Sequence, residues 1–195
     1  MIRFPPIEDA ALDAEQRRMA DMAQHGGPFQ AFLRAPSLWQ ALQSVRLYLS
    51  RQSSLDGYTR EALMLLIARH WTSPAGYAAH VALAQKAGLT DADIDALGRG
   101  CAPVGSGAVA GCAIEFASGL LTDHRVGDAQ FADASGILGE RTLVDIIGLI
   151  GFFSTICLTL NVMDAKGPAP FGPRDGDYSP ADETPAAGSG AEPAM

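Results

Sequence analysis

The chain has 195 residues, of which 48% are hydrophobic and 18% are charged. This length and composition predict one globular domain with a substantial core, followed at most by a tail. Its formal net charge is −8, with only 14 Lys and Arg, which argues against nucleic acid as a partner because phosphate binding needs clustered cations.

Nearly every segment up to about residue 163 has the apolar spacing of a helix, and no run alternates apolar and polar residues as a half-buried strand does. Two helix starts carry local signals. Ser73-Pro74 places a hydroxyl at the N-cap and a proline at the first helical position, and Thr90 with Asp93 resembles a capping box. The sequence predicts an all-α bundle of about eight helices, over residues 14–24, 37–51, 59–71, 74–87, 91–98, 107–121, 128–135 and 140–163.

Two segments bear on location. The most apolar window, 144–160, is interrupted by Asp145 and by small or hydroxyl residues, and no apolar run reaches the roughly 18 residues that a spanning helix needs. Segment 1–16 lacks the apolar core of a signal peptide. We therefore expect a cytoplasmic protein without a membrane partner, in which 144–160 is a buried helix.

The composition changes at about residue 165 to a stretch rich in Pro, Gly, Ala and acids. Such sequence cannot bury enough apolar area to offset its chain entropy. We expect a helical domain over 1–164 and an extended or disordered tail over 165–195. Within this tail, Pro170, Phe171 and Tyr178 are the candidates for anchoring an extended arm on a neighbouring subunit.

The three cysteines, Cys101, Cys112 and Cys157, are odd in number and form no close pair in sequence. Both a disulfide framework and a zinc site are therefore disfavoured. We expect at least one of the three to be a small core residue.

Two ionisable residues lie nineteen positions apart in otherwise apolar helical sequence. Glu61 is followed by Ala and then LMLLIA, and His80 lies between GYAA and VALA. Such groups are costly to bury unless they are paired or used. On the predicted helix that carries His80, the positions of Ser73, Gly76 and Tyr77 lie on the same face. These residues form the candidate site.

The spacing from Glu61 resembles that of the alkylhydroperoxidase D-like (AhpD-like) proteins. With glutamate as the reference, those proteins carry cysteines at plus twelve and plus fifteen and a histidine at plus nineteen. The matching residues here are Ser73, Gly76 and His80, so the framework matches while both cysteines are absent. Because peroxide reduction needs a thiolate and a resolving cysteine, a hydroperoxide reductase is disfavoured.

The chain from about residue 3 to 165 is similar to the cysteine-less branch of the same superfamily, the carboxymuconolactone decarboxylase-like proteins. Many of these relatives have Tyr-Glu-Trp before the histidine, where this chain has Ala75, Gly76 and Tyr77. The resemblance implies an AhpD-like helical bundle that assembles as a homo-oligomer, a trimer or hexamer, with sites near subunit boundaries. The matching segments, in order, are 27–29 with 35–36, 60–61, 69–71, 80–89 and 126–161.

The resemblance also implies roles for the candidate residues. In the resembling decarboxylases, loss of carbon dioxide leaves an electron-rich dienolate, which a histidine can protonate. His80 would be the general acid/base and Glu61 its orienting partner, since imidazole can transfer a proton near neutral pH. The candidate substrate-binding residues are Ser73, Gly76, Tyr77 and His25, the last beside a glycine-rich segment. The candidates for binding a substrate carboxylate are Arg34, Arg46, Arg60, Arg69 and Arg141.

Individual residues of the site keep a second interpretation. Ser73 is first an N-cap whose oxygen accepts a backbone hydrogen bond, and the free amides of that helix start could receive a substrate carboxylate. Gly76 indicates either a pocket enlarged for a bulkier ligand or a site that has lost its original chemistry. Tyr77 is either a hydrogen-bond donor into that space or a packing residue.

Three functions follow, in order of preference. The first is a lyase or isomerase that uses no metal or cofactor and acts on a small carboxylated lactone or a related product of aromatic ring cleavage. The second is a noncatalytic small-ligand-binding protein on the same scaffold. The third is an AhpD-like hydroperoxide reductase.

Overall fold

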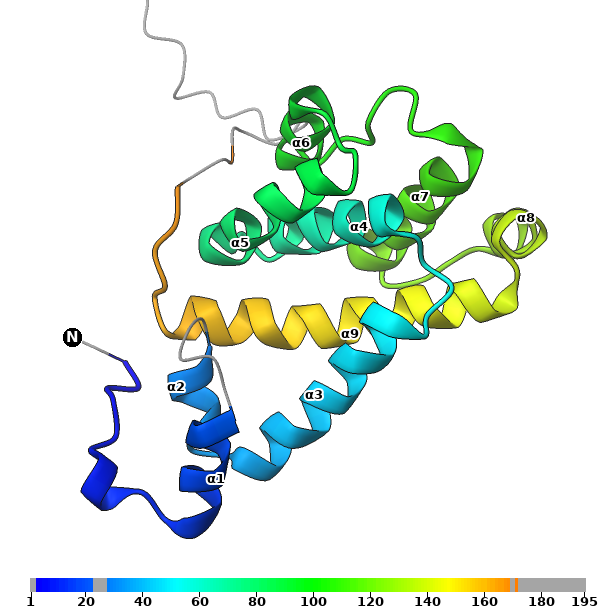
Figure 1. The fold of residues 1–195 in the computed structure, drawn as a ribbon. Helices are drawn as coiled ribbons and strands as arrows, with labels where there is room; N and C mark the ends of the chain where they lie inside the picture. Colours follow the sequence, from blue (N-terminus) through cyan, green and yellow to red (C-terminus); the bar gives the residue numbers. More distant parts are fainter. Residues whose placement is uncertain (1–2, 23–27, 169–170, 172–195) are drawn as a thin grey trace, which may run out of the picture.

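The computed structural model describes residues 3–22, 28–168 and 171, and within them the chain is all-α (Figure 1). The described residues form a 3-10 helix and nine α-helices and contain no strand. The prediction of an all-α bundle of about eight helices is therefore confirmed. The helices are η1 (Asp9–Ala11), α1 (Ala14–Met22), α2 (Phe29–Phe32), α3 (Pro36–Arg51), α4 (Gly57–His70), α5 (Pro74–Lys86), α6 (Asp91–Gly98), α7 (Gly107–Asp123), α8 (Asp128–Leu138) and α9 (Glu140–Val162).

The predicted boundaries differ from the observed ones mainly at helix ends. The α4 helix begins two residues earlier than expected because Asp56, at its N-cap, accepts a hydrogen bond from Thr59 N at 2.9 Å. The capping box of Thr90 and Asp93 at the start of α6 is present. The sequence missed α2, whose four residues are too few to show a helical period.

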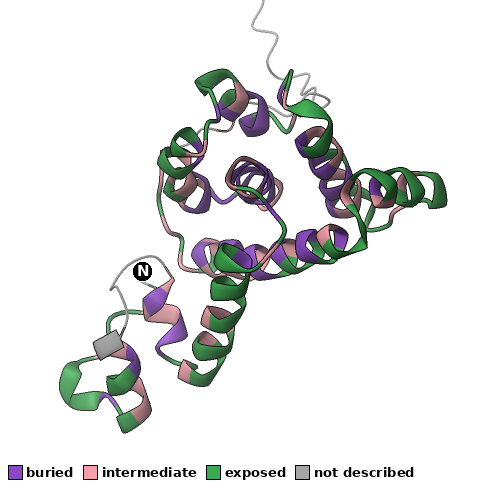
Figure 2. Ribbon diagram, turned by 45° about the vertical axis from the view of Figure 1, so that its right-hand side comes forward, coloured by how far each residue is buried: buried purple, intermediate pink, exposed green. Residues whose placement is uncertain are grey.

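The α4 helix occupies the centre of the bundle, surrounded by α5, α6, α7 and α9 (Figures 1 and 2). Every residue from Glu61 to Arg69 is buried, as expected for a helix that is apolar on almost all sides. The α5 helix is less enclosed within this chain, since Leu83 is 48% exposed and the buried residues are Gly76, Tyr77 and Ala84.

The α9 helix packs against α3, α4, α5, α7 and α8. Its buried Asp145 accepts hydrogen bonds from Tyr48 Oη at 2.7 Å, Ser54 N at 2.7 Å and Ser54 Oγ at 2.8 Å. Burial acts to raise the pKa of Asp145, but these hydrogen bonds outweigh it and the pKa is lowered. Asp145 thus ties the end of α3 and the following loop to α9.

By length and composition, α9 meets the requirement for a membrane-crossing helix, with a mean hydropathy of 2.2. The expectation that no segment is long and apolar enough is therefore wrong. In the most apolar 18-residue window of α9, 44% is buried inside the bundle. A core helix of a helical bundle can have the same length and hydropathy as a membrane-crossing helix.

A second, smaller hydrophobic cluster lies beside the bundle, among the residues that flank η1, α1, α2 and the first turns of α3 (Figure 1). Phe32 stacks on Trp39 with ring centroids 4.9 Å apart, and Ile156 of α9 packs against the cluster. The N-terminal segment is therefore attached to the bundle through α3 and α9. The buried members of the cluster are Leu12, Met19, Phe29, Phe32 and Leu33.

Candidate functional site

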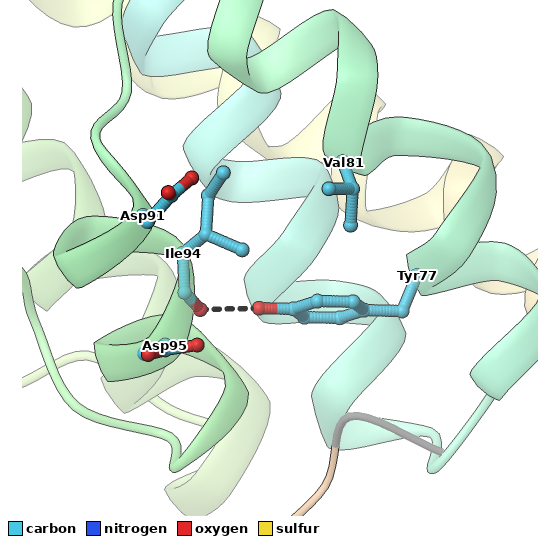
Figure 3. Close-up of a pocket in the computed structure, with 5 residues that line it drawn as sticks. All are labelled: Tyr77, Val81, Asp91, Ile94 and Asp95. Atoms are coloured by element: carbon cyan, nitrogen blue, oxygen red, sulfur yellow. Dashed lines mark hydrogen bonds between the residues drawn. The ribbon is translucent and has the colours of Figure 1, made fainter. Parts of the chain in front are cut away.

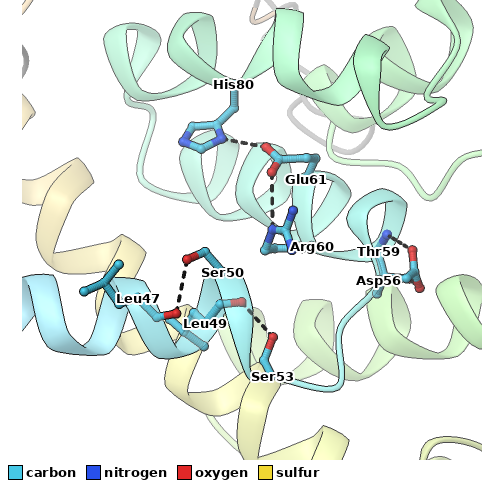
Figure 4. A network of polar contacts seen from close by, with 9 residues as sticks. All are labelled: Leu47, Leu49, Ser50, Ser53, Asp56, Thr59, Arg60, Glu61 and His80. Atoms are coloured by element: carbon cyan, nitrogen blue, oxygen red, sulfur yellow. Dashed lines mark hydrogen bonds and ion pairs between the residues drawn. The ribbon is translucent and has the colours of Figure 1, made fainter.

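Glu61 and His80 form a hydrogen-bonded pair between α4 and α5 (Figure 4). His80 Nδ1 lies 2.8 Å from Glu61 Oε2, and Arg60 Nε lies 3.4 Å from Glu61 Oε1. The Glu61 side chain is 8% exposed, compared with 17% for His80 and 24% for Arg60. The structure therefore brings together the two residues that the sequence singled out and adds Arg60 as a cation on the second carboxylate oxygen.

The Glu61 carboxylate determines what the His80 ring can do. A carboxylate on Nδ1 holds the proton there in the neutral ring, which leaves Nε2 as the acceptor. Among the described residues, Nε2 has no hydrogen-bond partner. When His80 is protonated, Arg60, Glu61 and His80 together carry one positive charge, which suits an anionic ligand.

Phe153 of α9 packs against His80 of this pair. Its ring meets the His80 ring edge-on, with centroids 4.8 Å apart and planes at 79°. The contact covers part of the imidazole, so that only a limited part of the ring meets solvent. Sequence reasoning did not find Phe153, because nothing in the local pattern of α9 indicates which helix it packs against.

Ser73 and Gly76 lie in a closed part of the contact between α5 and α9. Ser73 is fully buried, and its Oγ has no hydrogen-bond partner of good geometry. A Cβ built on Gly76 would lie 3.1 Å from Ser73 Oγ and 3.2 Å from Cys157 Sγ. The Ser73 hydroxyl and the Cys157 thiol therefore fill the space beside Gly76, and the structure contains no enlarged pocket there.

The prediction that the Ser73 oxygen caps α5 is wrong. Ser73 occupies the N-cap position, but its side chain accepts no capping hydrogen bond. The hydroxyl lies instead toward Gly76 and the Cys157 thiol, inside the helix contact.

Cys157 of α9 was not among the predicted site residues, yet its thiol lies beside Gly76 of α5. It is fully buried, and this burial raises the pKa of its thiol to about 12, although the neighbouring Ser73 hydroxyl opposes the effect. A thiol of this kind is protonated at neutral pH and is a poor nucleophile. Cys101 and Cys112 are partly exposed.

Tyr77 points toward α6 (Figure 3). Its hydroxyl donates a hydrogen bond to the backbone oxygen of Ile94, and its side chain is almost completely buried. Burial raises its pKa to about 12, assisted by Asp95 and opposed by Arg69. The structure therefore shows Tyr77 as a packing residue and not as a donor into the space beside Gly76.

A pocket of ≈ 250 Å³ lies on the Tyr77 side of α5 (Figure 3). Two of its lining residues, Asp91 and Asp95, are carboxylates, so that it does not suit an anionic substrate. The others are Tyr77, Val81 and Ile94.

The chain after α9 turns back over the start of α5. A Cβ built on Gly167 would lie 2.7 Å from the Pro74 carbonyl oxygen and 2.9 Å from Ala75 N. Phe171 meets the Tyr77 ring edge-on at 5.3 Å and lies under the Arg69 guanidinium at 5.1 Å. This segment lies against Ala75 N, one of the α5 amides that could have received a substrate carboxylate.

Phe171 was predicted to anchor an arm on a neighbouring subunit, but here it contacts its own chain. Pro170 and Tyr178, the other predicted anchors, lie outside the described residues, as does most of the predicted tail over 165–195.

His25, a candidate substrate-binding residue, also lies outside the described residues. His70 meets the ring of Trp71, and His124 ends α7 in a left-handed conformation. Of the candidate arginines, Arg34 and Arg141 donate to backbone oxygens, and Arg46 donates to Gln43. Arg69 is buried over the Phe171 ring, and Arg60 is bonded to the Glu61 carboxylate.

No group of three or more His, Cys, Asp or Glu residues in the described part of the chain is arranged to hold a metal ion. Comparisons with protein-family models, with curated proteins and with solved structures found no match to this chain.

Proposed function

We propose that this protein is a lyase or isomerase that needs no metal or cofactor and acts on a small carboxylated lactone or a related product of aromatic ring cleavage. The observation that carries this proposal is the Glu61–His80 pair, with Nδ1 held by the carboxylate at 2.8 Å and Nε2 without a partner among the described residues. An imidazole held in this way is equipped for general acid–base catalysis at Nε2.

In the decarboxylation, the bond between the ring carbon and the carboxylate breaks, carbon dioxide leaves, and the electron pair remains as a dienolate. Protonated His80 then donates its Nε2 proton to the substrate carbon, and water returns a proton to the ring. In the isomerisation, neutral His80 removes a proton from one carbon and returns it to another. Glu61 stabilises the imidazolium in both reactions, and Arg60 is the candidate partner of a substrate carboxylate.

The proposal also includes a family, an oligomeric state and a cellular location. The chain belongs, in this proposal, to the cysteine-less carboxymuconolactone decarboxylase-like branch of the AhpD-like proteins, acts in the cytoplasm and forms a trimer or hexamer. The all-α bundle and the position of Glu61 against His80 support this assignment.

A second candidate is a noncatalytic small-ligand-binding protein on the same scaffold. The filled space beside Gly76 favours it, because the part of the site that carries reactive groups in the resembling proteins is closed by Ser73 and Cys157. A hydroperoxide reductase is disfavoured, because the Cys157 thiol is buried and has a raised pKa.

The test combines thermal stabilisation and turnover across small carboxylated lactones, muconate-like diacids and organic hydroperoxides. Binding to the folded state raises the melting temperature by mass action. For a substrate found in this way, we expect His80→Gln to lower kcat/KM by about 100-fold or more, within the range of general acid–base catalysis. The matched variant His124→Gln, at the exposed end of α7, should keep wild-type activity.

A loss of less than tenfold in His80→Gln would remove His80 from the chemistry. Binding without any substrate change over long incubation would favour the ligand-binding function. Rapid dithiol-dependent reduction of a hydroperoxide would overturn both.

A further inference from the structure

The outer face of α9 carries exposed apolar side chains near both ends and small residues between them, a surface here called the α9 stripe. Its large members are exposed by 65% at Val144, 50% at Ile147, 43% at Leu158 and 51% at Val162. The spacing of three and four residues places them on one side of the helix, with Gly148, Gly151 and Thr155 between them. The only charged residue between Val144 and Val162 is Asp145, which is buried against α3 and its loop. Exposed apolar side chains gathered on one side of a helix are typical of interaction sites.

The stripe is complementary to itself when it is reversed about the level of residue 153. Positions equally distant from 153 pair Val144 with Val162, Gly148 with Leu158, and Gly151 with Thr155. A Cβ on Gly151 would meet nothing within 4 Å, and one on Gly148 would meet only Leu49 Cδ2, at 4.0 Å. The large Leu158 side chain therefore has open space above Gly148 of a second, antiparallel helix.

We propose that the α9 stripe is the contact surface for a second copy of this chain, with the two α9 helices packed antiparallel about a two-fold axis at the level of residue 153. In such a contact the same surface of each copy faces the other, so that each complementary pair occurs twice.

The charges at the ends of α9 are compatible with this pairing. Glu140 and Arg141 lie in its first turn, and Asp164 and Lys166 follow its last turn, where they form an ion pair at 2.6 Å within one copy. The antiparallel arrangement brings the first turn of each α9 to the end of the other, so that charges of both signs lie at each end of the contact.

The size of the contact requires a contribution from α3. The stripe from Val144 to Val162 is about 27 Å long, and a stable interface buries about 800 Å² per partner, which a single helix face does not reach. Tyr48, held beside α9 by its hydrogen bond to Asp145, is 37% exposed, and Val45 one turn before it is 39% exposed. These side chains extend the apolar surface across α3.

The charge pattern favours a second copy over a lipid surface. Helices that lie on membranes carry Lys and Arg along their polar flank. The α9 helix has one basic residue, Arg141 at its first turn, and the whole chain has a formal charge of −8.

This contact is separate from the proposed reaction. His80 packs against Phe153, whose side chain is buried on the inner side of α9, so that a second copy on the stripe contributes nothing to the His80 ring. A two-fold contact also requires an even number of copies. It is compatible with a dimer or a hexamer but not with a lone trimer.

The first test measures the mass of the full chain in solution by light scattering and sedimentation. We expect an even-numbered assembly that Val144→Asp dissociates to half its mass, with an association constant lowered at least tenfold, because an aspartate would be buried opposite Val162. The matched control is Val104→Asp, at a position 99% exposed in the loop before α7, which should leave the assembly unchanged. Circular dichroism must show both variants folded.

A wild-type monomer or lone trimer, or an unchanged assembly of folded Val144→Asp, would overturn the proposal. Activity of His80 variants has no bearing on this result, so the two proposals fail independently.

The register is tested by cysteine crosslinking. The double variant Gly151→Cys/Thr155→Cys should form a disulfide-linked dimer on mild oxidation, because the antiparallel pairing places each new thiol opposite the other on the second copy. The control pair Val144→Cys/Gly151→Cys, which this register does not place opposite each other, should crosslink at least tenfold more slowly. Faster crosslinking of Gly151→Cys alone would indicate a parallel arrangement and overturn the register.

Two other occupants of the stripe give distinct results. Co-sedimentation of the full chain with neutral phosphatidylcholine vesicles, abolished by Val144→Asp, would show a membrane-binding face. Loss of assembly in a chain ending at residue 171 would show that the C-terminal residues, and not the stripe alone, make the contact between copies. Either result would overturn the proposed contact.

Discussion

The two ends of the contact between α5 and α9 differ in what they leave accessible. At one end, His80 packs on Phe153 and keeps one ring nitrogen without a partner among the described residues. At the other, Ser73, Gly76 and Cys157 fill the space between the helices. His80 and Gly76 lie one turn apart on one face of α5, yet their surroundings differ. The His80 ring can exchange a proton with a ligand, whereas the space beside Gly76 is filled by protein atoms.

The largest expected effect is on stability, at the closed end. Gly76→Val should lower the free energy of unfolding by about 3 kcal/mol, because its side chain must displace both Ser73 Oγ and Cys157 Sγ. For a chain of this size the melting temperature should fall by roughly 6–12 °C. The matched control, Gly136→Val on exposed α8, has open space around its Cβ and should change stability by less than about 1 kcal/mol.

A double-mutant cycle sharpens this prediction. Adding Cys157→Ala to Gly76→Val should recover at least about 1 kcal/mol, since contacting residues are energetically coupled. Additive effects of the two substitutions would show that the closed packing described above is not present in solution.

The next effect is on activity, at the accessible end. Glu61→Gln should lower kcat/KM by roughly 10- to 100-fold, because the amide can still hold Nδ1 but does not stabilise the imidazolium. The matched Glu115→Gln, on the exposed side of α7, should keep full activity. Steady-state kinetics over a range of pH distinguish a change in proton transfer from a change in binding alone. Equal activity of Glu61→Gln and wild type would contradict the orienting role of Glu61.

The third effect is a pH dependence of stability caused by Cys157. The folded-state pKa of its thiol, about 12, lies above the value of an exposed thiol, so that rising pH ionises the thiol first in the unfolded chain. The contribution of the Cys157 thiol to the free energy of unfolding is fully present below about pH 8 and is lost as the pH rises toward 12. The free energy of unfolding should therefore decrease on the order of 1–2 kcal/mol by pH 10.

Urea unfolding at pH 8 and pH 10 measures this decrease, and Cys157→Ala should show a smaller one. Thiol labelling of the folded protein provides a second measurement. The partly exposed Cys101 and Cys112 should react first, and Cys157 only on unfolding. Rapid labelling of Cys157 in the folded protein would mean that the closed end opens.

The smallest expected effect is at the start of α5, beside the closed end. Gly167→Val should displace the segment after α9, because its side chain would overlap the Pro74 carbonyl and Ala75 N. The stability of the bundle should change by less than about 1 kcal/mol, since residue 167 lies outside the helices. Hydrogen exchange of the first α5 amides should become faster, whereas the matched Gly127→Val, before α8, should leave it unchanged. Unchanged exchange in Gly167→Val would show that this segment does not cover α5.

The sequence predicted the helices well because their signals are local. The Ser73-Pro74 start and the Thr90–Asp93 capping box lie within a few residues of the helices that they begin. The pairing of Glu61 with His80 was also predictable, since a buried carboxylate and a partly buried imidazole on consecutive helices stabilise each other. The Ser73 example shows the limit of such signals, because a residue at the right position for capping makes no capping hydrogen bond.

By itself, then, the sequence determined the all-α class, most helix boundaries and the pair at the centre of the candidate site. The tertiary structure alone decided that Cys157 lies against Gly76, that Tyr77 bonds to Ile94, and that one side of α9 remains exposed. The first two of these features are contacts between residues of different helices, and Gly76 and Cys157 are more than eighty positions apart in the sequence. A helical pattern specifies which side of each helix is apolar, but the helix that covers that side depends on how all the helices pack together.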